Sequence, residues 1–128
     1  MKLVVGGFGN GKLEHVLEMT GLTMDSVARG FDEAGKKPVF YGLQDEVRKA
    51  LAQGQDPEAL MDKALAENPG LIVICDEVGS GVVPVEKEER RYREAVGRLC
   101  CRLAVSAGRV ERVVCGIAMV LKGEEEWR

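Results

Sequence analysis

A phosphate-binding pattern lies near the start of the sequence. Residues 6–12 read GGFGNGK, the Gly-x-x-x-x-Gly-Lys form of a loop that binds nucleotide phosphates. Backbone N–H groups of such a loop turn inward around an anion, and Lys12 would reach the β and γ phosphates. The pattern normally continues with Ser or Thr, whose hydroxyl binds Mg²⁺, but Leu13 stands there. We expect nucleotide affinity to survive better than catalysis, because leucine offers a metal no oxygen.

The predicted nucleotide site takes in the loop and the start of the helix after it. The residues expected to bind ATP or GTP are Gly6, Gly7, Phe8, Gly9, Asn10, Gly11, Lys12 and Leu13. A helix that begins at Lys12 would add its N-terminal dipole to the attraction for phosphate. The alternative is a glycine-rich turn without a ligand. His15, the only histidine, is predicted to be a surface or packing residue, because catalysis would need a partner within hydrogen-bonding distance.

An acidic pair follows the clearest apolar strand of the sequence. Asp76 and Glu77 come directly after Leu71–Cys75. Parallel strands end at the same edge of a sheet, so Asp76 or Glu77 would face Lys12. Carboxylate oxygens suit Mg²⁺, and we expect Asp76 and Glu77 as its ligands, with Lys12 and Glu77 as catalytic residues. The alternative is that an acid here only begins a turn.

Short apolar segments alternate with helical patterns, which predicts an α/β fold. The predicted strands are Lys2–Val5, Pro38–Tyr41, Leu71–Cys75 and a last parallel strand Val110–Cys115, with an edge strand at Ala118–Leu121. The predicted helices run from Lys12 to about Gly21 and over Met24–Ala34, Gln44–Ala52, Asp56–Glu67 and Glu86–Ala107. We expect one domain over residues 1–123, with the three-layer P-loop-type architecture of a mostly parallel sheet flanked by helices. Residues 124–128 are expected to form a solvated acidic tail.

Composition limits the classes of partner. The 128 residues carry a formal charge of −3 without a basic cluster, so nucleic acid is not an expected partner. No apolar segment approaches the roughly 18 residues that span a bilayer, and the run Leu3–Val5 is too short for a signal peptide. The four cysteines form no C-x-x-C pair and are expected to be buried free thiols of a cytoplasmic protein. They are Cys75, Cys100, Cys101 and Cys115.

Several longer motifs resemble one known family. Residues 77–84 read EVGSGVVP, residues 90–97 read RRYREAVG, and residues 110–122 read VERVVCGIAMVLK. These are similar to the E-V-G-x-G-I-V-P, R-x-F-R-D-x-x-G and closing G-I-x-x-x-x-K motifs of bifunctional adenosylcobinamide kinase/adenosylcobinamide-phosphate guanylyltransferases of cobalamin synthesis. Residues 4–12 resemble that family's phosphate loop, G-G-x-x-S-G-K-S. The middle of the chain, PVFYGLQDEVRKAL and GQDPEALMDKAL, is a weaker but collinear match.

The sequence departs from the family pattern at positions that carry chemistry. Leu13 replaces the phosphate-loop serine, Tyr41 replaces an acid at the end of the middle strand, and Cys100-Cys101 replaces an Asn-Gln pair. The family's guanylylated histidine lies in an insert that is reduced here to about residues 20–37 and contains no histidine. Asp76 stands where the family usually has Asn, so the resemblance favours Glu77 as the metal residue. Asp76 would then compensate for the acid lost at Tyr41.

Three functions remain open from the sequence. The resemblance and its departures favour a divergent nucleotide-binding protein that has lost guanylyl transfer and whose kinase chemistry is impaired. The second is a retained kinase that phosphorylates a corrinoid hydroxyl with ATP or GTP and Mg²⁺. The third is a non-catalytic binding or assembly module. The resemblance also implies self-association, as a trimer.

Overall fold

Six strands form one sheet in the computed structural model, which describes residues 1–78, 85–123 and 126–127. The sheet order is β2-β3-β4-β1-β5-β6. The strands are β1 (Lys2–Gly6), β2 (Val27–Ala28), β3 (Val39–Tyr41), β4 (Ile72–Asp76), β5 (Arg109–Val114) and β6 (Ile117–Gly123). The first five run parallel, and β6 pairs antiparallel with β5. The carboxyl ends of β1, β4 and β5 therefore meet at one edge of the sheet.

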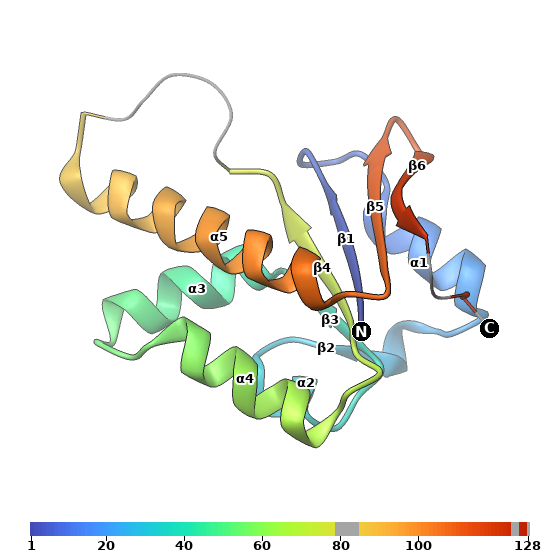
Figure 1. The fold of residues 1–128 in the computed structure, drawn as a ribbon, viewed down its shortest axis with the longest axis horizontal. Helices are drawn as coiled ribbons and strands as arrows, with labels where there is room; N and C mark the ends of the chain where they lie inside the picture. Colours follow the sequence, from blue (N-terminus) through green and yellow to red (C-terminus); the bar gives the residue numbers. More distant parts are fainter. Residues whose placement is uncertain (79–84, 124–125, 128) are drawn as a thin grey trace.

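Helices cover both faces of this sheet, as Figure 1 shows. The helices are α1 (Lys12–Thr20), α2 (Phe31–Ala34), α3 (Leu43–Ala52), α4 (Pro57–Glu67) and α5 (Lys87–Ser106). Helix α1 lies on one face, whereas α2 to α5 lie on the other. The predicted three-layer α/β architecture is confirmed. In the described part of the chain, no helix is long and apolar enough to cross a membrane.

The core divides into two apolar clusters, one on each face of the sheet. Strand β4 contributes to both, because Val73 and Cys75 face α2–α5 while Ile72 and Ile74 face α1. A strand buried on both faces has to be apolar throughout, which is why residues 71–75 could be recognised as a strand. Phe40 and Leu99 are among the largest side chains of the α2–α5 face, and both are almost fully buried.

The prediction of one helix over Met24–Ala34 is wrong. The segment contains a 3₁₀ turn (Met24–Ser26), strand β2 and the four-residue helix α2. Gly30 has a φ of 123°, which no helix permits, and so it separates β2 from α2. Val27 and Ala28 pair in parallel with Val39 and Phe40. Pairing at the sheet edge thus overrides the helical spacing of the apolar residues. The predicted edge strand Ala118–Leu121 is present but longer, as β6.

Candidate functional site

The glycine-rich loop joins the end of β1 to the start of α1, at the edge where the parallel strands end. Gly9 and Gly11 have φ values of 74° and 85°, which turn the loop back toward α1. Gly11 is the N-cap of α1 and supplies no side chain to satisfy the N–H groups of the first turn. Phe8 is 91% exposed, so its ring does not fill the interior of the loop. This arrangement suits an anion.

Lys12 points into the loop. Its side chain is only 4% exposed, and its Nζ donates to the carbonyl oxygen of Gly7 at 2.8 Å. The same Nζ forms an ion pair with Asp76 Oδ1 at 2.6 Å. Asp76 ends β4, in register with Gly6 at the end of β1. The structure therefore brings Lys12 and Asp76 together, as expected of neighbouring parallel strands.

Glu77 belongs to a second ion pair at this edge, with a residue that the sequence reasoning missed. Arg112 on β5 donates from Nε to Glu77 Oε1 at 2.7 Å and from Nη2 to Oε2 at 3.1 Å. The Glu77 N–H donates to the carbonyl of Gly6 at 2.9 Å, which fixes the start of this segment beside the loop. The charged residues within β5, which reads RVERVV, were the signal that could have drawn attention to Arg112.

The turn between β5 and β6 holds the loop in place. The Asn10 side chain accepts from Cys115 N–H at 3.2 Å, and the Asn10 carbonyl accepts from Gly116 N–H at 2.9 Å. Gly6 is required by close approach, because a Cβ there would lie 2.5 Å from the Val113 carbonyl oxygen. Asn10 thus acts as an anchor of the loop, which its place in the motif did not reveal.

The oxygen donors of the site fit Mg²⁺ only in part. Asp76 and Glu77 are the hard carboxylate ligands that Mg²⁺ prefers, but a cation occupies each of them. Leu13 and Tyr41 both pack against the apolar cluster on the α1 face. The Arg29 guanidinium lies over the Tyr41 ring, 5.1 Å from its centroid. No group of three or more His, Cys, Asp or Glu side chains that could hold a metal occurs among the described residues. Residues 79–84 of the EVGSGVVP motif lie outside that part.

A cavity of about 380 Å³ adjoins the acidic pair on the α5 face of the sheet. It is lined by Val5, Asp76, Glu77, Val78, Val96, Gly97 and Cys100. Its walls are mostly apolar, and Asp76 and Glu77 are its acidic lining residues. Such a cavity can hold an apolar group beside a reacting phosphate.

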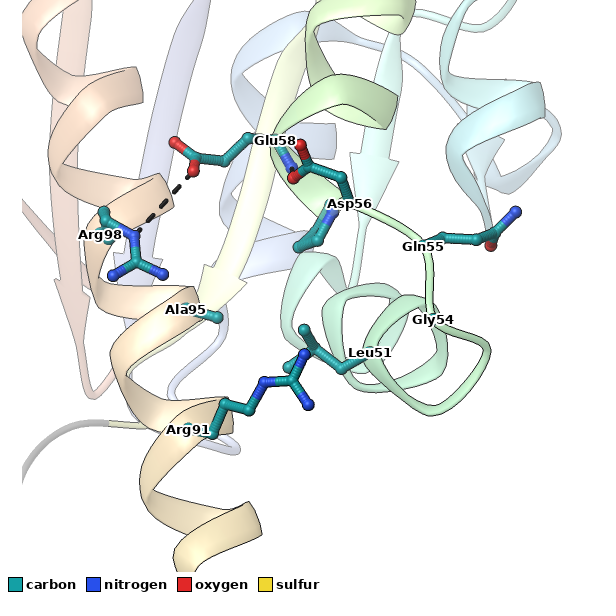
Figure 2. A pocket seen from close by; sticks show the side chains of 9 residues that line it. Leu51, Gly54, Gln55, Asp56, Glu58, Arg91, Ala95 and Arg98 are labelled. Carbon is teal, nitrogen blue, oxygen red and sulfur yellow. Dashed lines mark hydrogen bonds and ion pairs between the residues drawn. The ribbon is translucent and has the colours of Figure 1, made fainter.

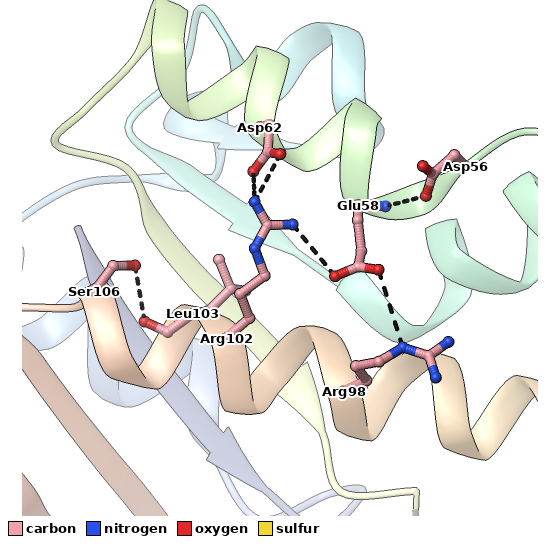
Figure 3. Close-up of polar contacts among 7 residues, drawn as sticks. All are labelled: Asp56, Glu58, Asp62, Arg98, Arg102, Leu103 and Ser106. Carbon is pink, nitrogen blue, oxygen red and sulfur yellow. Dashed lines mark hydrogen bonds and ion pairs between the residues drawn. The ribbon is translucent and has the colours of Figure 1, made fainter.

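A second cavity, of about 330 Å³, lies away from the loop between the α3–α4 turn and α5 (Figure 2). Arg98 in its wall pairs with Glu58 at 3.9 Å, and Asp56 caps α4 by accepting from the Glu58 N–H. Figure 3 shows that Arg102 extends the same network to Glu58 and Asp62. The network joins α4 to α5, and we assign it to packing of these helices.

The four cysteines are free, but they are not all buried. Cys75 is buried and Cys100 is half-buried, whereas Cys101 and Cys115 are exposed. The prediction of four buried thiols is wrong for the last two, because Cys101 lies on the outer side of α5 and Cys115 in a turn with a φ of 50°. The hydrogen bond with Cys100 and burial raise the pKa of the Cys75 thiol well above its ordinary value. Cys75 is therefore protonated near neutral pH.

His15 is half-buried and lies within hydrogen-bonding distance of a buried acid, and its expected role as a packing residue stays a prediction. Its Nε2 lies 2.7 Å from Oε1 of Glu111, which is 1% exposed on β5. Trp127 packs edge-to-face against the His15 ring at 5.8 Å and donates to Glu111 Oε2 at 2.8 Å. The expected solvated tail over residues 124–128 is therefore wrong at Trp127, because its ring joins the cluster on the α1 face.

Known proteins of one family match a large part of this chain. Residues 37–121 match the family model described as cobinamide kinase / cobinamide phosphate guanyltransferase. The bifunctional adenosylcobalamin biosynthesis protein CobU of Escherichia coli is 36% identical over 93 residues, which cover 72% of this chain and 50% of that protein. CobU of Salmonella typhimurium is 38% identical over 89 residues, 57% of this chain and 49% of the relative.

A third relative, the bifunctional adenosylcobalamin biosynthesis protein CobP of Pseudomonas aeruginosa, is 43% identical over 68 residues. These cover 52% of this chain and 39% of that protein, so the chain matches half or less of the length of each of these relatives. The family match begins after the phosphate loop and includes the acidic pair, α5 and most of β6. On the extent of that match, the chain belongs to the cobinamide kinase / cobinamide phosphate guanyltransferase family.

Proposed function

We propose that this chain is a divergent nucleotide-binding member of the family, which binds ATP or GTP at residues 6–13. The observation that carries the proposal is the buried Lys12 ammonium, which lies inside the loop on the Gly7 carbonyl and Asp76. A nucleotide phosphate can take the place of these oxygens, since it brings more negative charge to the same cation. The uncapped first turn of α1 adds N–H donors to the phosphate site.

Guanylyl transfer is the activity that we propose to be lost. Within residues 20–37 the sequence contains no histidine to accept a guanylyl group. His15 offers no substitute, because Glu111 and Trp127 hold its ring against β5. Kinase chemistry is impaired in this proposal, because Leu13 and Tyr41 supply no carboxylate or aliphatic hydroxyl where the family has an oxygen ligand and an acid.

A second candidate function is retained phosphorylation of a corrinoid hydroxyl. The 380 Å³ cavity beside Asp76 and Glu77 favours it, since an acceptor could lie there next to a bound triphosphate. When bound, Mg²⁺ would neutralise charge on the phosphates, and Asp76 and Glu77 are the residues that would hold it. A non-catalytic binding module remains the third possibility, and nucleotide titration distinguishes it from the other two.

Isothermal titration with ATP, GTP and GDP, each with and without Mg²⁺, tests the proposal. We expect micromolar to millimolar binding of a triphosphate, with at most a several-fold gain from Mg²⁺ because Leu13 lacks the ligand oxygen. A gain of about 100-fold from Mg²⁺ would instead support the retained kinase. If none of the three nucleotides binds, the two nucleotide-dependent functions are excluded and the non-catalytic module is the candidate that is left.

We also propose that the chain self-associates, as a trimer by resemblance to the family. Strand β6 offers an apolar surface for this, because Ile117, Val120 and Leu121 are exposed on an edge strand. Multi-angle light scattering is expected to give the mass of three chains for the wild type and a smaller mass for Leu121→Lys. A wild-type monomer at high protein concentration would contradict the proposal.

A further inference from the structure

Arg112 is the second cation at the edge of the sheet that carries the phosphate loop. It lies on β5 beside Val5 of β1, one residue before the strand enters the loop through Gly6. Its side chain is 45% exposed, in contrast to the buried Lys12. The bidentate pair with Glu77 joins its guanidinium to the residue whose N–H donates to the Gly6 carbonyl.

Two ion pairs therefore hold the adjacent acids Asp76 and Glu77, and each joins a cation of the kind that binds phosphate to an acid of the kind that binds metal. Lys12 pairs with Asp76, and Arg112 pairs with Glu77. A metal-nucleotide complex also carries both charges, since its phosphates are negative and its metal ion is positive. The metal can bind the two carboxylates while the phosphates bind Lys12 and Arg112. Each of the four charged side chains then exchanges one partner for another of the same sign. That matters because an uncompensated charge in a partly buried site is costly.

We propose that Arg112 is a second phosphate-binding residue, which Glu77 holds until a metal-nucleotide complex exchanges the partners. The inference rests on the proposed nucleotide binding at residues 6–13. The planar guanidinium fork suits phosphate oxygens as well as it suits the Glu77 carboxylate. In the absence of nucleotide, Arg112 also lowers the affinity of Glu77 for metal, because both compete for the same oxygens.

The variant Arg112→Met tests this with two measurements that should change in opposite directions. Mn²⁺ binding without nucleotide, followed by electron paramagnetic resonance, is expected to tighten about three-fold, since the pair that competes for Glu77 is partly exposed and therefore weak. Affinity for the Mg²⁺ complex of ATP or GTP is expected to weaken about ten-fold, through loss of one charged hydrogen-bond donor. A purely structural role for Arg112 would weaken both.

The variant Arg102→Met is the matched control. Arg102 also pairs with acids, because its Nη2 donates to both carboxylate oxygens of Asp62 and its Nη1 to Glu58, but it does so between α4 and α5 and away from the loop (Figure 3). We expect it to leave both affinities unchanged. Arg112→Gln, a polar replacement, serves as the second variant if Arg112→Met unfolds. Glu77→Gln should show the reverse pattern, with weaker Mn²⁺ binding and tighter nucleotide binding in the absence of metal.

The outcomes separate this inference from the proposed function. Opposite changes in Mn²⁺ and nucleotide affinity support the partner exchange. If the wild type binds a triphosphate and Arg112→Met binds metal and nucleotide as the wild type does, Arg112 is not a phosphate ligand while nucleotide binding stands. Parallel losses of both affinities also overturn the exchange. If the wild type binds no nucleotide, the proposed function and this inference fail together.

Discussion

Replacing Glu111 by Gln is expected to lower the free energy of unfolding by about 3 kcal/mol near neutral pH. Glu111 is buried on β5 and accepts from His15 and from Trp127, and it also pairs with Arg109. Glutamine has the shape of glutamate, but its NH₂ group would face His15 or Trp127, each of which already donates a hydrogen bond to this position. It also leaves the Arg109 guanidinium opposite a neutral group, which is the costly way to break a buried pair.

The same carboxylate predicts how stability depends on pH. Burial opposes its ionisation, but hydrogen bonds from Arg109, His15 and Trp127 outweigh burial and lower the pKa of Glu111 below its ordinary value. A lowered pKa in the folded state stabilises the protein above the ordinary pKa of Glu. That contribution is lost as the pH falls through the lowered value. The difference in stability between the wild type and Glu111→Gln should therefore shrink in acid.

Urea unfolding followed by the fluorescence of Trp127, the single tryptophan, measures both effects. The experiment compares wild type and Glu111→Gln near neutral pH and at an acidic pH below the ordinary pKa of Glu. Glu18→Gln is the control, because Glu18 is exposed on the outer side of α1. A loss of stability for Glu111→Gln no larger than that for Glu18→Gln would contradict the assignment. A difference that grows in acid would contradict the direction of the pKa shift.

The sequence predicts most of the fold because its strong signals are local. Strand β4 is apolar on both faces, and α4 begins at Asp56-Pro57, where Asp56 caps the helix through the Glu58 N–H. The segment 24–34 was not predictable in the same way. Its spacing of Val27 and Phe31 fits a helix, but the parallel pairing of β2 with β3 is a contact with a distant segment and determines the result.

Some contacts of the candidate site could be predicted from the sequence, and others could not. The meeting of Lys12 with Asp76 follows from the order of the parallel strands and could be expected from the sequence. The pairing of Arg112 with Glu77 could not, because the sequence does not show that β5 lies beside β1. The same holds for Asn10, whose partners lie in the β5–β6 turn. Residues that act across the sheet become visible only when the strand order is known.

Replacing Lys12 by Met is expected to weaken binding of ATP or GTP by about 50-fold, because a charged donor in a buried site is worth roughly 2–3 kcal/mol. Lys12 is the cation that the loop surrounds, and Met keeps its length while it removes the charge. Lys63→Met, at an exposed position on α4, is the control and should bind as the wild type does. Titration calorimetry at one fixed Mg²⁺ concentration gives the comparison.

The same substitution also affects stability, and a double variant separates the two effects. Lys12→Met leaves the Asp76 carboxylate, which is 19% exposed, without the Lys12 ammonium, so we expect a loss of about 2 kcal/mol in the free energy of unfolding. Adding Asp76→Asn removes that charge and should recover most of the stability, while nucleotide affinity stays low. If affinity returned together with stability, Lys12 would only hold the loop in shape. Asp76→Asn alone, if it left the Mg²⁺-dependent affinity unchanged, would exclude Asp76 as a metal ligand and leave Glu77 in that role.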